Sequence, residues 1–242
     1  MKLISEKFDN KLKNDFISVS RDNNPVFSQI RNISFSQKLE VIKQYSLFPK
    51  NIISMLVSAA YSLSYHNWDK VVEEILQNIN EEMGGGKGRI TKHNQPHYTV
   101  LRQVVQDSFQ ENINSVKPTK STQNFIDNIK KILIHETPEV VAGGVYALES
   151  SAVPELFLLR EFVLSAAQDK NVNISQTFLD FFEWHINDIE VEHRDRFMKM
   201  LSSYIKTNEQ WILFEDGFNS VMNTMDCWWT ELNQELIQTT HA

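Results

Sequence analysis

Apolar residues recur with helical spacing through most of the chain, and no segment alternates apolar and polar residues as a strand does. Seven glycines and six prolines in 242 residues leave long stretches without a helix breaker. Four of the glycines stand together within residues 84–88, where a helix is expected to end. The pattern predicts an all-α fold of eight or nine helices, with residues 1–242 forming one domain.

Breakers and capping residues place the expected helix boundaries. Pro49 is expected to end a short helix that Ser36 begins, and Pro154 is expected to kink a long helix. Ser175 is expected to cap the helix that follows, and Thr207 or Asn208 the last one. The other expected helices cover about residues 3–20, 36–47, 50–65, 67–83, 96–110, 123–137 and 139–168.

Charge and composition exclude several classes of protein. The net charge of −7 argues against a general nucleic-acid binder, and no apolar run reaches the roughly 18 residues of a membrane span. The first residues carry charge early and contain no apolar core of a signal peptide. The single cysteine, Cys227, rules out an intrachain disulfide and fits a reducing compartment. We therefore expect a cytoplasmic protein that binds neither nucleic acid nor membranes.

Four of the expected helices carry an ionisable residue on the face that should be buried. Glu82 falls about 20° from the centre of its helix's apolar stripe, whereas Glu81 points about 120° away. On the long helix, Glu149 shares a face with Tyr146. The four inward residues are Glu82, His97, Glu149 and His185.

A metal centre explains these inward residues better together than any of them alone. A single buried acid or histidine is more often capped, solvated or paired. Burying several acids without partners is costly, and a bound metal removes that cost. Histidine and carboxylate without cysteine suit iron or manganese better than a structural zinc. The alternative is a metal-free helical interaction protein that carries these groups on its surface.

The segment from Trp184 to His193 packs three acids and two histidines into ten residues. Glu190 and His193 form the Glu-x-x-His pair of di-iron carboxylate bundles. One extra residue in the turn, a π-bulge, would bring both onto one face with His185. A straight helix would instead use His185 with Asp188 and Glu192. Both arrangements stay open.

Three motifs resemble, in the right order, those of the haem-oxygenase-like di-iron oxidases and oxygenases. They are Asn-x-x-Glu-Glu-x-Gly at 78–84 followed by His97, Tyr-x-x-Glu at 146–149, and a His-x4-Glu-x2-His stretch at 185–193. The resemblance spans about residues 45–205. It implies a bundle of about seven core helices, preceded here by N-terminal helices, that binds two iron ions and uses O2 as co-substrate. It also implies a homodimer.

The resemblance implies a set of iron ligands by position. The last motif is one residue longer than usual, which leaves Asp188 or Glu192 as alternatives to Glu190. The glycine loop is also long, which leaves His93 as an alternative to His97, and Glu155 is close enough in sequence to be a seventh ligand. The implied ligands are Glu82, His97, Glu149, His185, Glu190 and His193.

Within the superfamily, the chain is similar in length and in its acidic, asparagine-rich helices to the AetD-type nitrile synthases. This similarity implies conversion of an amino acid, a brominated tryptophan, into an indole-3-carbonitrile in natural-product biosynthesis, with electrons from an external donor. The alternatives are N-oxygenation or oxidative decarboxylation of another amine or a fatty acid. Arg160 is the first candidate for a carboxylate anchor and Arg194 the second. The expected aromatic walls are Tyr146, Phe157, Phe178 and Phe181.

Overall fold

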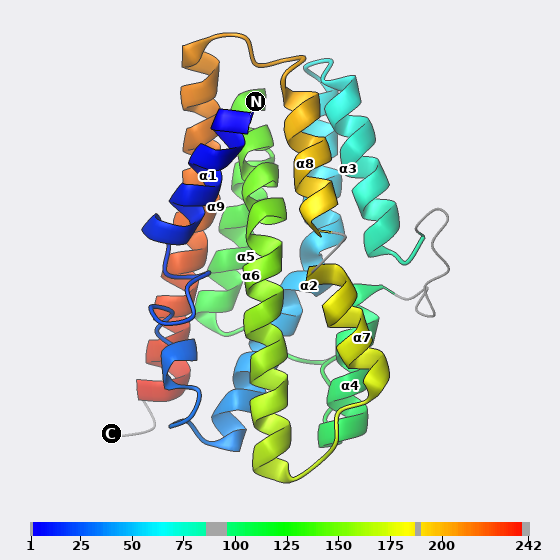
Figure 1. The fold of residues 1–242 in the computed structure, drawn as a ribbon, viewed down its shortest axis with the longest axis vertical. Coiled ribbons are helices and arrows are strands. Elements are labelled where there is room, and N and C mark those ends of the chain that lie inside the picture. Colours follow the sequence, from blue (N-terminus) through cyan, green and yellow to red (C-terminus); the bar gives the residue numbers. More distant parts are fainter. Residues whose placement is uncertain (1, 86–95, 187–189, 239–242) are drawn as a thin grey trace.

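The computed structural model describes residues 2–85, 96–186 and 190–238, and within them the fold is all-helical, as predicted (Figure 1). None of the described helices is both long enough and apolar enough to cross a membrane. The elements are α1 (Lys2–Asp15), the 3-10 turn η1 (Phe27–Gln29), α2 (Phe35–Ser64), α3 (Asp69–Glu82), α4 (His97–Phe109), α5 (Lys120–Leu133), α6 (Pro138–Lys170), α7 (Gln176–Trp184), α8 (Glu190–Leu201), α9 (Asn208–Asn233) and the π-helical turn η3 (Gln234–Gln238).

The long helix α6 runs through the middle of the bundle and packs most extensively against α9 and α2 (Figure 1). Two glycines let α6 and α9 approach closely. A Cβ atom at Gly143 of α6 would lie 1.9 Å from the carbonyl oxygen of Phe214, and one at Gly217 of α9 would lie 2.0 Å from that of Val140. The two backbones touch here because neither residue has a side chain.

The predicted caps of two helices are confirmed. The Ser175 side chain accepts a hydrogen bond from the backbone N–H of Phe178 and begins α7. Thr207 begins α9 with a capping box, in which its side chain accepts from the N–H of Gln210 and the Gln210 side chain returns to the Thr207 backbone. Both helices therefore start where local side-chain chemistry satisfies their first N–H groups.

The prediction of a helix end at Pro49 was wrong. The helix α2 runs from Phe35 to Ser64 through this proline, and Ser34 rather than Ser36 caps it. A proline inside a helix removes one hydrogen bond at a cost of about 3 kcal/mol. Leu47 and Leu56, on either side of Pro49, are buried, and their burial on one continuous helix offsets that cost. Pro154 likewise lies within α6 without ending it.

The first helix is shorter than predicted, and it is anchored on α9. Phe8 of α1 packs edge-on against Phe214, with their ring centroids 5.3 Å apart. After α1 ends, the Asp226 carboxylate of α9 accepts hydrogen bonds from the backbone N–H groups of Ile17 and Ser18. Glu215 of α9 also pairs with two lysines of α1, Lys7 and Lys11. These contacts hold α1 as an outer wall over α6.

Candidate metal centre

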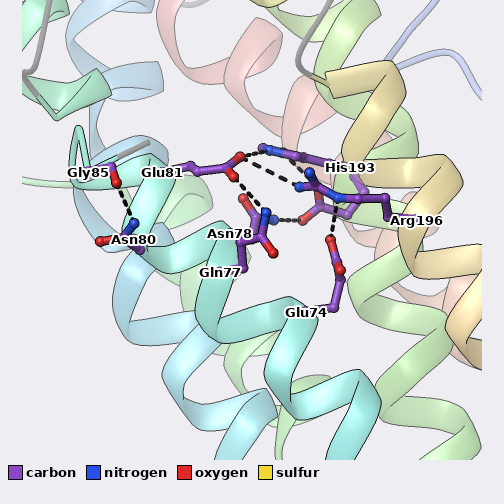
Figure 2. Close-up of polar contacts among 9 residues, drawn as sticks. Glu74, Gln77, Asn78, Asn80, Glu81, Gly85, His193 and Arg196 are labelled. Carbon is purple, nitrogen blue, oxygen red and sulfur yellow. Dashed lines mark hydrogen bonds and ion pairs between the residues drawn. The ribbon is translucent and has the colours of Figure 1, made fainter. Parts of the chain in front are cut away.

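One buried histidine lies between two carboxylates from different helices. Figure 2 shows Glu81, near the end of α3, pointing toward His193 of α8, and the His193 Nε2 contacts a carboxylate oxygen of Glu81. The other ring nitrogen, Nδ1, lies 3.7 Å from an oxygen of Glu149 on α6. His193 is 4% exposed and Glu149 is 7% exposed. Three helices thus bring an imidazole and two carboxylates together in the interior.

Further polar groups hold these carboxylates in place. The Arg196 Nε donates to Glu74 at 2.7 Å, and the Arg196 Nη2 lies 3.6 Å from Glu81. The side-chain amide of Asn78 donates to Glu149. Outer hydrogen bonds of this kind orient metal ligands and set their basicity. We call these residues the acid–histidine network: Glu74, Asn78, Glu81, Glu149, His193 and Arg196.

The charge of Glu81 is stabilised despite its partial burial. Burial would raise the pKa of Glu81, but hydrogen bonds from His193 and Gln77 outweigh this effect and, with nearby positive charge, lower the pKa to about 2. Ionised carboxylates only accept hydrogen bonds. Both ring nitrogens of His193 face carboxylates, so a metal ion bound to this imidazole would have a carboxylate within reach.

A second feature is a largely apolar pocket of about 90 Å³ among α2, α3, α4, α6 and α7, which we call the glutamate pocket. Three acids line it: Glu82, Glu149 and Glu155. Glu149 also belongs to the acid–histidine network, so the pocket and the network share one carboxylate. The side chains of two neighbouring residues of α3 therefore lie in different places, because Glu82 lines the glutamate pocket while Glu81 contacts His193 of α8.

Glu155 is a buried acid with only one hydrogen-bonded oxygen. It is 2% exposed, and the Tyr45 hydroxyl donates to its Oε2 at 3.3 Å. Its Oε1 has no hydrogen-bond partner among the described residues. Burial raises the pKa of Glu155 to about 8, and the charge of Asp226 contributes in the same direction. In the metal-free chain this carboxyl group therefore keeps its proton at neutral pH.

Replacing Glu155 with glutamine is expected to flatten the pH dependence of stability. The pKa of Glu155 rises from an ordinary 4.5 to about 8 on folding, so between these values the folded state binds one more proton than the unfolded state. The free energy of unfolding contributed by this group therefore falls as the pH rises from 4.5 to 8. The free energy of unfolding of Glu155→Gln, relative to that of wild type, should therefore increase by on the order of a few kcal/mol from pH 5 to pH 8.

Urea unfolding of the iron-free proteins at pH 5, 6.5 and 8 measures this effect. Glu183→Gln is the matched control, because Glu183 is an exposed acid on α7. Parallel pH profiles for wild type and Glu155→Gln would contradict the raised pKa.

His185 is oriented as metal-binding histidines usually are. It is 3% exposed, and its Nδ1 lies 2.7 Å from the backbone oxygen of Phe181. A carbonyl oxygen only accepts, so Nδ1 carries a proton, and in the neutral imidazole Nε2 is then the nitrogen that can bind a metal. The hydrogen bonding at His185 and Ile186 is π-helical. Residues 187–189 lie outside the described part of the chain, so both alternatives for this segment stay predictions.

Several predicted ligands fall partly or wholly outside the described residues. His97 begins α4 and Glu190 begins α8, as the described backbone shows, but their side chains are not described. The side chain of Glu192 is likewise outside the described part. His93 and Asp188 lie outside it altogether. These assignments stay predictions.

The donor groups that are described fit iron in chemistry. Within the described side chains, no three histidine, cysteine, aspartate or glutamate groups converge closely enough to hold an ion by themselves. Those that approach one another are imidazole and carboxylate, which suit iron and manganese. The single cysteine, Cys227, is exposed on α9. An ion at the acid–histidine network would also neutralise the buried acids that meet there.

Two of the predicted aromatic walls line pockets next to Glu149. Phe181 lines the glutamate pocket. Phe157 lines a larger pocket of about 450 Å³ between α1, α6 and α8, which we call the α1 pocket. Arg194, the second predicted anchor, also lines the α1 pocket. The complete lining is Asp9, Leu12, Lys13, Val19, Arg21, Glu149, Ser150, Val153, Pro154, Phe157, Leu158, Ile186 and Arg194.

The other three predicted substrate residues lie elsewhere. Tyr146 is fully buried among aromatic rings of α1 and α9, including Phe8 at a centroid distance of 5.6 Å. Phe178 is buried against Phe182 within α7. Arg160 pairs with its neighbour Glu161 at 3.4 Å and is about one-third exposed. None of the three lines the glutamate pocket or the α1 pocket, because each is engaged by its own helix or by core packing.

Sequence reasoning missed the face of α3 that meets α8. Glu74, Asn78 and Glu81 are spaced i, i+4 and i+7, so they share one helix face. Arg196 follows His193 by one helical turn on α8. This spacing was visible in the sequence. A polar face of this kind is also typical of a solvated helix, so only the position of α8 identifies it as part of a site.

Comparison with known proteins gives a family and a fold. No curated protein matches the chain. A crystal structure of a CADD-like protein of unknown function from Nostoc punctiforme PCC 73102 is similar over 98% of both chains, with 27% identity and a TM-score of 0.87. A second crystal structure of that same protein of unknown function is similar over 98% of this chain and 96% of that one, with 26% identity and a TM-score of 0.86. Residues 2–235 match the model of a domain of unknown function with solved structure, DUF3865, so the chain belongs to the DUF3865 family.

Proposed function

We propose that this protein is an O2-activating, non-haem di-iron oxidase or oxygenase. The observation that carries the proposal is His193, buried between Glu81 and Glu149, with Glu149 also lining two pockets. The motif order supports it, and so does the likeness to CADD-like proteins, which belong to the haem-oxygenase-like di-iron superfamily. A purely structural ion-pair network has no need of adjoining pockets.

The candidate ligands come from four helices and from the turn after α7. The ligands with described side chains include Glu149 of α6, His193 of α8 and His185 after α7. Glu82 or Glu81 of α3 supplies a further carboxylate. His97 of α4 and Glu190 of α8 complete the set in this proposal. Bound iron would supply the electron transfer to O2 that no side chain provides.

The chain's own residues then perform four tasks. Arg196 and Asn78 fix the orientation of the carboxylates that they contact. The apolar wall of the glutamate pocket, which includes Leu148 and Leu156, excludes water from one side of the centre. Glu155, in the wall of the same pocket, holds a proton, because its carboxyl group is neutral at pH 7 in the iron-free chain. The α1 pocket offers room for an organic molecule next to Glu149.

For the substrate, we propose an amino acid, and a tryptophan derivative converted to an indole-3-carbonitrile as the first to test. The support is the resemblance in sequence together with the α1 pocket, where an aromatic wall and arginine adjoin Glu149. An external donor would supply electrons to return the irons to the ferrous state. We also propose a cytoplasmic location and a homodimer.

Anaerobic reconstitution with Fe(II) tests the proposal first. We expect about two iron ions per chain, as in other di-iron carboxylate bundles. Addition of O2 and a reductant with a panel of tryptophan derivatives, another amine and a fatty acid, followed by mass spectrometry, would then identify the product. Failure to bind iron would overturn the proposal and favour a metal-free helical protein. A product only from the fatty acid would overturn the amino-acid assignment but leave the di-iron assignment intact.

A further inference from the structure

The α1 pocket has the size and position of a substrate site. Its volume of about 450 Å³ falls within the roughly 300–1,000 Å³ of small-molecule sites. Its outer wall is α1 and the residues that follow, which α9 anchors through Glu215 and Asp226. Its inner wall includes Glu149. A molecule in this pocket therefore lies against Glu149, a carboxylate of the acid–histidine network.

Opposite charges stand side by side in the wall of the α1 pocket. The Arg194 Nη1 lies 3.0 Å from the Asp9 Oδ1, so a guanidinium and a carboxylate from different helices are adjacent. A free α-amino acid carries its carboxylate and its ammonium on the same carbon atom. The two charges of an amino acid therefore match a neighbouring guanidinium and carboxylate, each through charge-assisted hydrogen bonds.

Two cationic side chains of the α1 pocket have no acidic partner among the described residues. Lys13 and Arg21 line it as well, and neither forms an ion pair with any residue of the described part of the chain. The third cation of the lining, Arg194, is paired with Asp9 and also with Asp195, each at 3.0 Å. The two cations Lys13 and Arg21 favour a ligand with a carboxylate over one with an amine alone.

Apart from Ser150, the remaining wall is apolar. It includes Leu12 of α1, Ile186 of the π-helical turn, and Val153, Phe157 and Leu158 of α6. The ring of Phe157 offers a surface on which a second aromatic ring can stack. A long or aromatic side chain would bury apolar area there, whereas a small polar one would not.

From these features we propose that the α1 pocket binds the free α-amino acid head of the substrate, with an apolar or aromatic side chain along Phe157. Arg194 and Arg21 hold the carboxylate, and Asp9 holds the ammonium group. The proposal rests on the proposed function, because it names the substrate class and the substrate-binding residues of the same centre. It assigns the anchoring role to Arg194 rather than to Arg160, which pairs with Glu161 outside the pocket.

Binding to the full-length, iron-free protein tests this proposal separately from iron chemistry. Isothermal titration is run with L-tryptophan, with tryptamine, which lacks the carboxylate, with indole-3-propionate, which lacks the ammonium group, and with dodecanoate. We expect L-tryptophan to bind at least about tenfold more tightly than each of the other three. Equal affinity for indole-3-propionate, tightest binding of dodecanoate, or no binding at all would overturn the proposal, whatever the iron titration gives.

Two variants locate the binding site. Arg194→Gln and Arg21→Gln should each weaken L-tryptophan binding about tenfold or more, and Arg21→Gln breaks no ion pair of the described structure. Arg31→Gln is the control, because Arg31 is an exposed arginine outside the pocket. Unchanged affinity in both pocket variants would overturn the proposal. So would a loss in Arg160→Gln as large as that in Arg194→Gln.

Discussion

Replacing His193 with alanine is expected to reduce bound iron from about two ions per chain to one or fewer and to lower O2-dependent turnover by about a hundredfold or more. In the described structure His193 contacts carboxylates from two other helices, Glu81 of α3 and Glu149 of α6. Its loss removes a nitrogen ligand and the group that links those carboxylates. Iron analysis after anaerobic reconstitution and oxygen-electrode measurements check the two effects.

Two further variants separate metal binding from folding. His193→Gln keeps a side chain of similar length that can hydrogen-bond to Glu81 or Glu149, but it supplies no imidazole. It should therefore fold and still fail to hold the full complement of iron. His66→Ala, at an exposed histidine after α2, should bind iron as wild type does. A folded His193→Gln protein with two tightly bound iron ions would contradict the assignment of His193 as a ligand.

Local chemistry made much of the fold predictable. Ser175 and Thr207 begin α7 and α9 because their side chains satisfy N–H groups at the helix start, whatever lies around them. The same reasoning failed at Pro49, where local cost predicted a break. Burial of α2 against α6 and α3 depends on the whole bundle, and it keeps the helix continuous through the proline. Local rules therefore identify where helices start more reliably than where they continue.

The candidate site was predictable only where one helix face carried the signal. The apolar stripe predicts that Glu82 and Glu149 point inward, and both line the glutamate pocket. Glu81 lies off that stripe, and its contact with His193 arises because α8 packs against α3. Arg194 and Phe157 share a pocket for a similar reason, since α1 closes it. Such contacts between elements follow from tertiary packing, which periodicity along a single helix does not encode.

Replacing Gly143 with alanine is expected to destabilise the protein by at least about 3 kcal/mol. The added Cβ would lie 1.9 Å from the carbonyl oxygen of Phe214 and 2.8 Å from its carbonyl carbon. These are backbone atoms of α9, which cannot rotate away, so α6 and α9 must separate along their most extensive contact. Alanine favours an isolated helix by about 1 kcal/mol over glycine, so a net loss isolates the packing effect. Urea unfolding followed by circular dichroism measures it.

The neighbouring glycine provides the matched control and links this contact to the candidate metal centre. A Cβ atom at Gly144 would meet side-chain methyl groups, Ile132 Cγ2 at 3.1 Å and Leu133 Cδ2 at 3.2 Å. Those groups can adjust, so Gly144→Ala should change stability by no more than about 1 kcal/mol. Equal stability of the two variants would show that α6 and α9 are not in backbone contact. Glu149 lies fewer than two helical turns beyond Gly143 on α6. A separation of these helices should therefore also displace Glu149 from His193 and weaken iron binding in Gly143→Ala but not in Gly144→Ala.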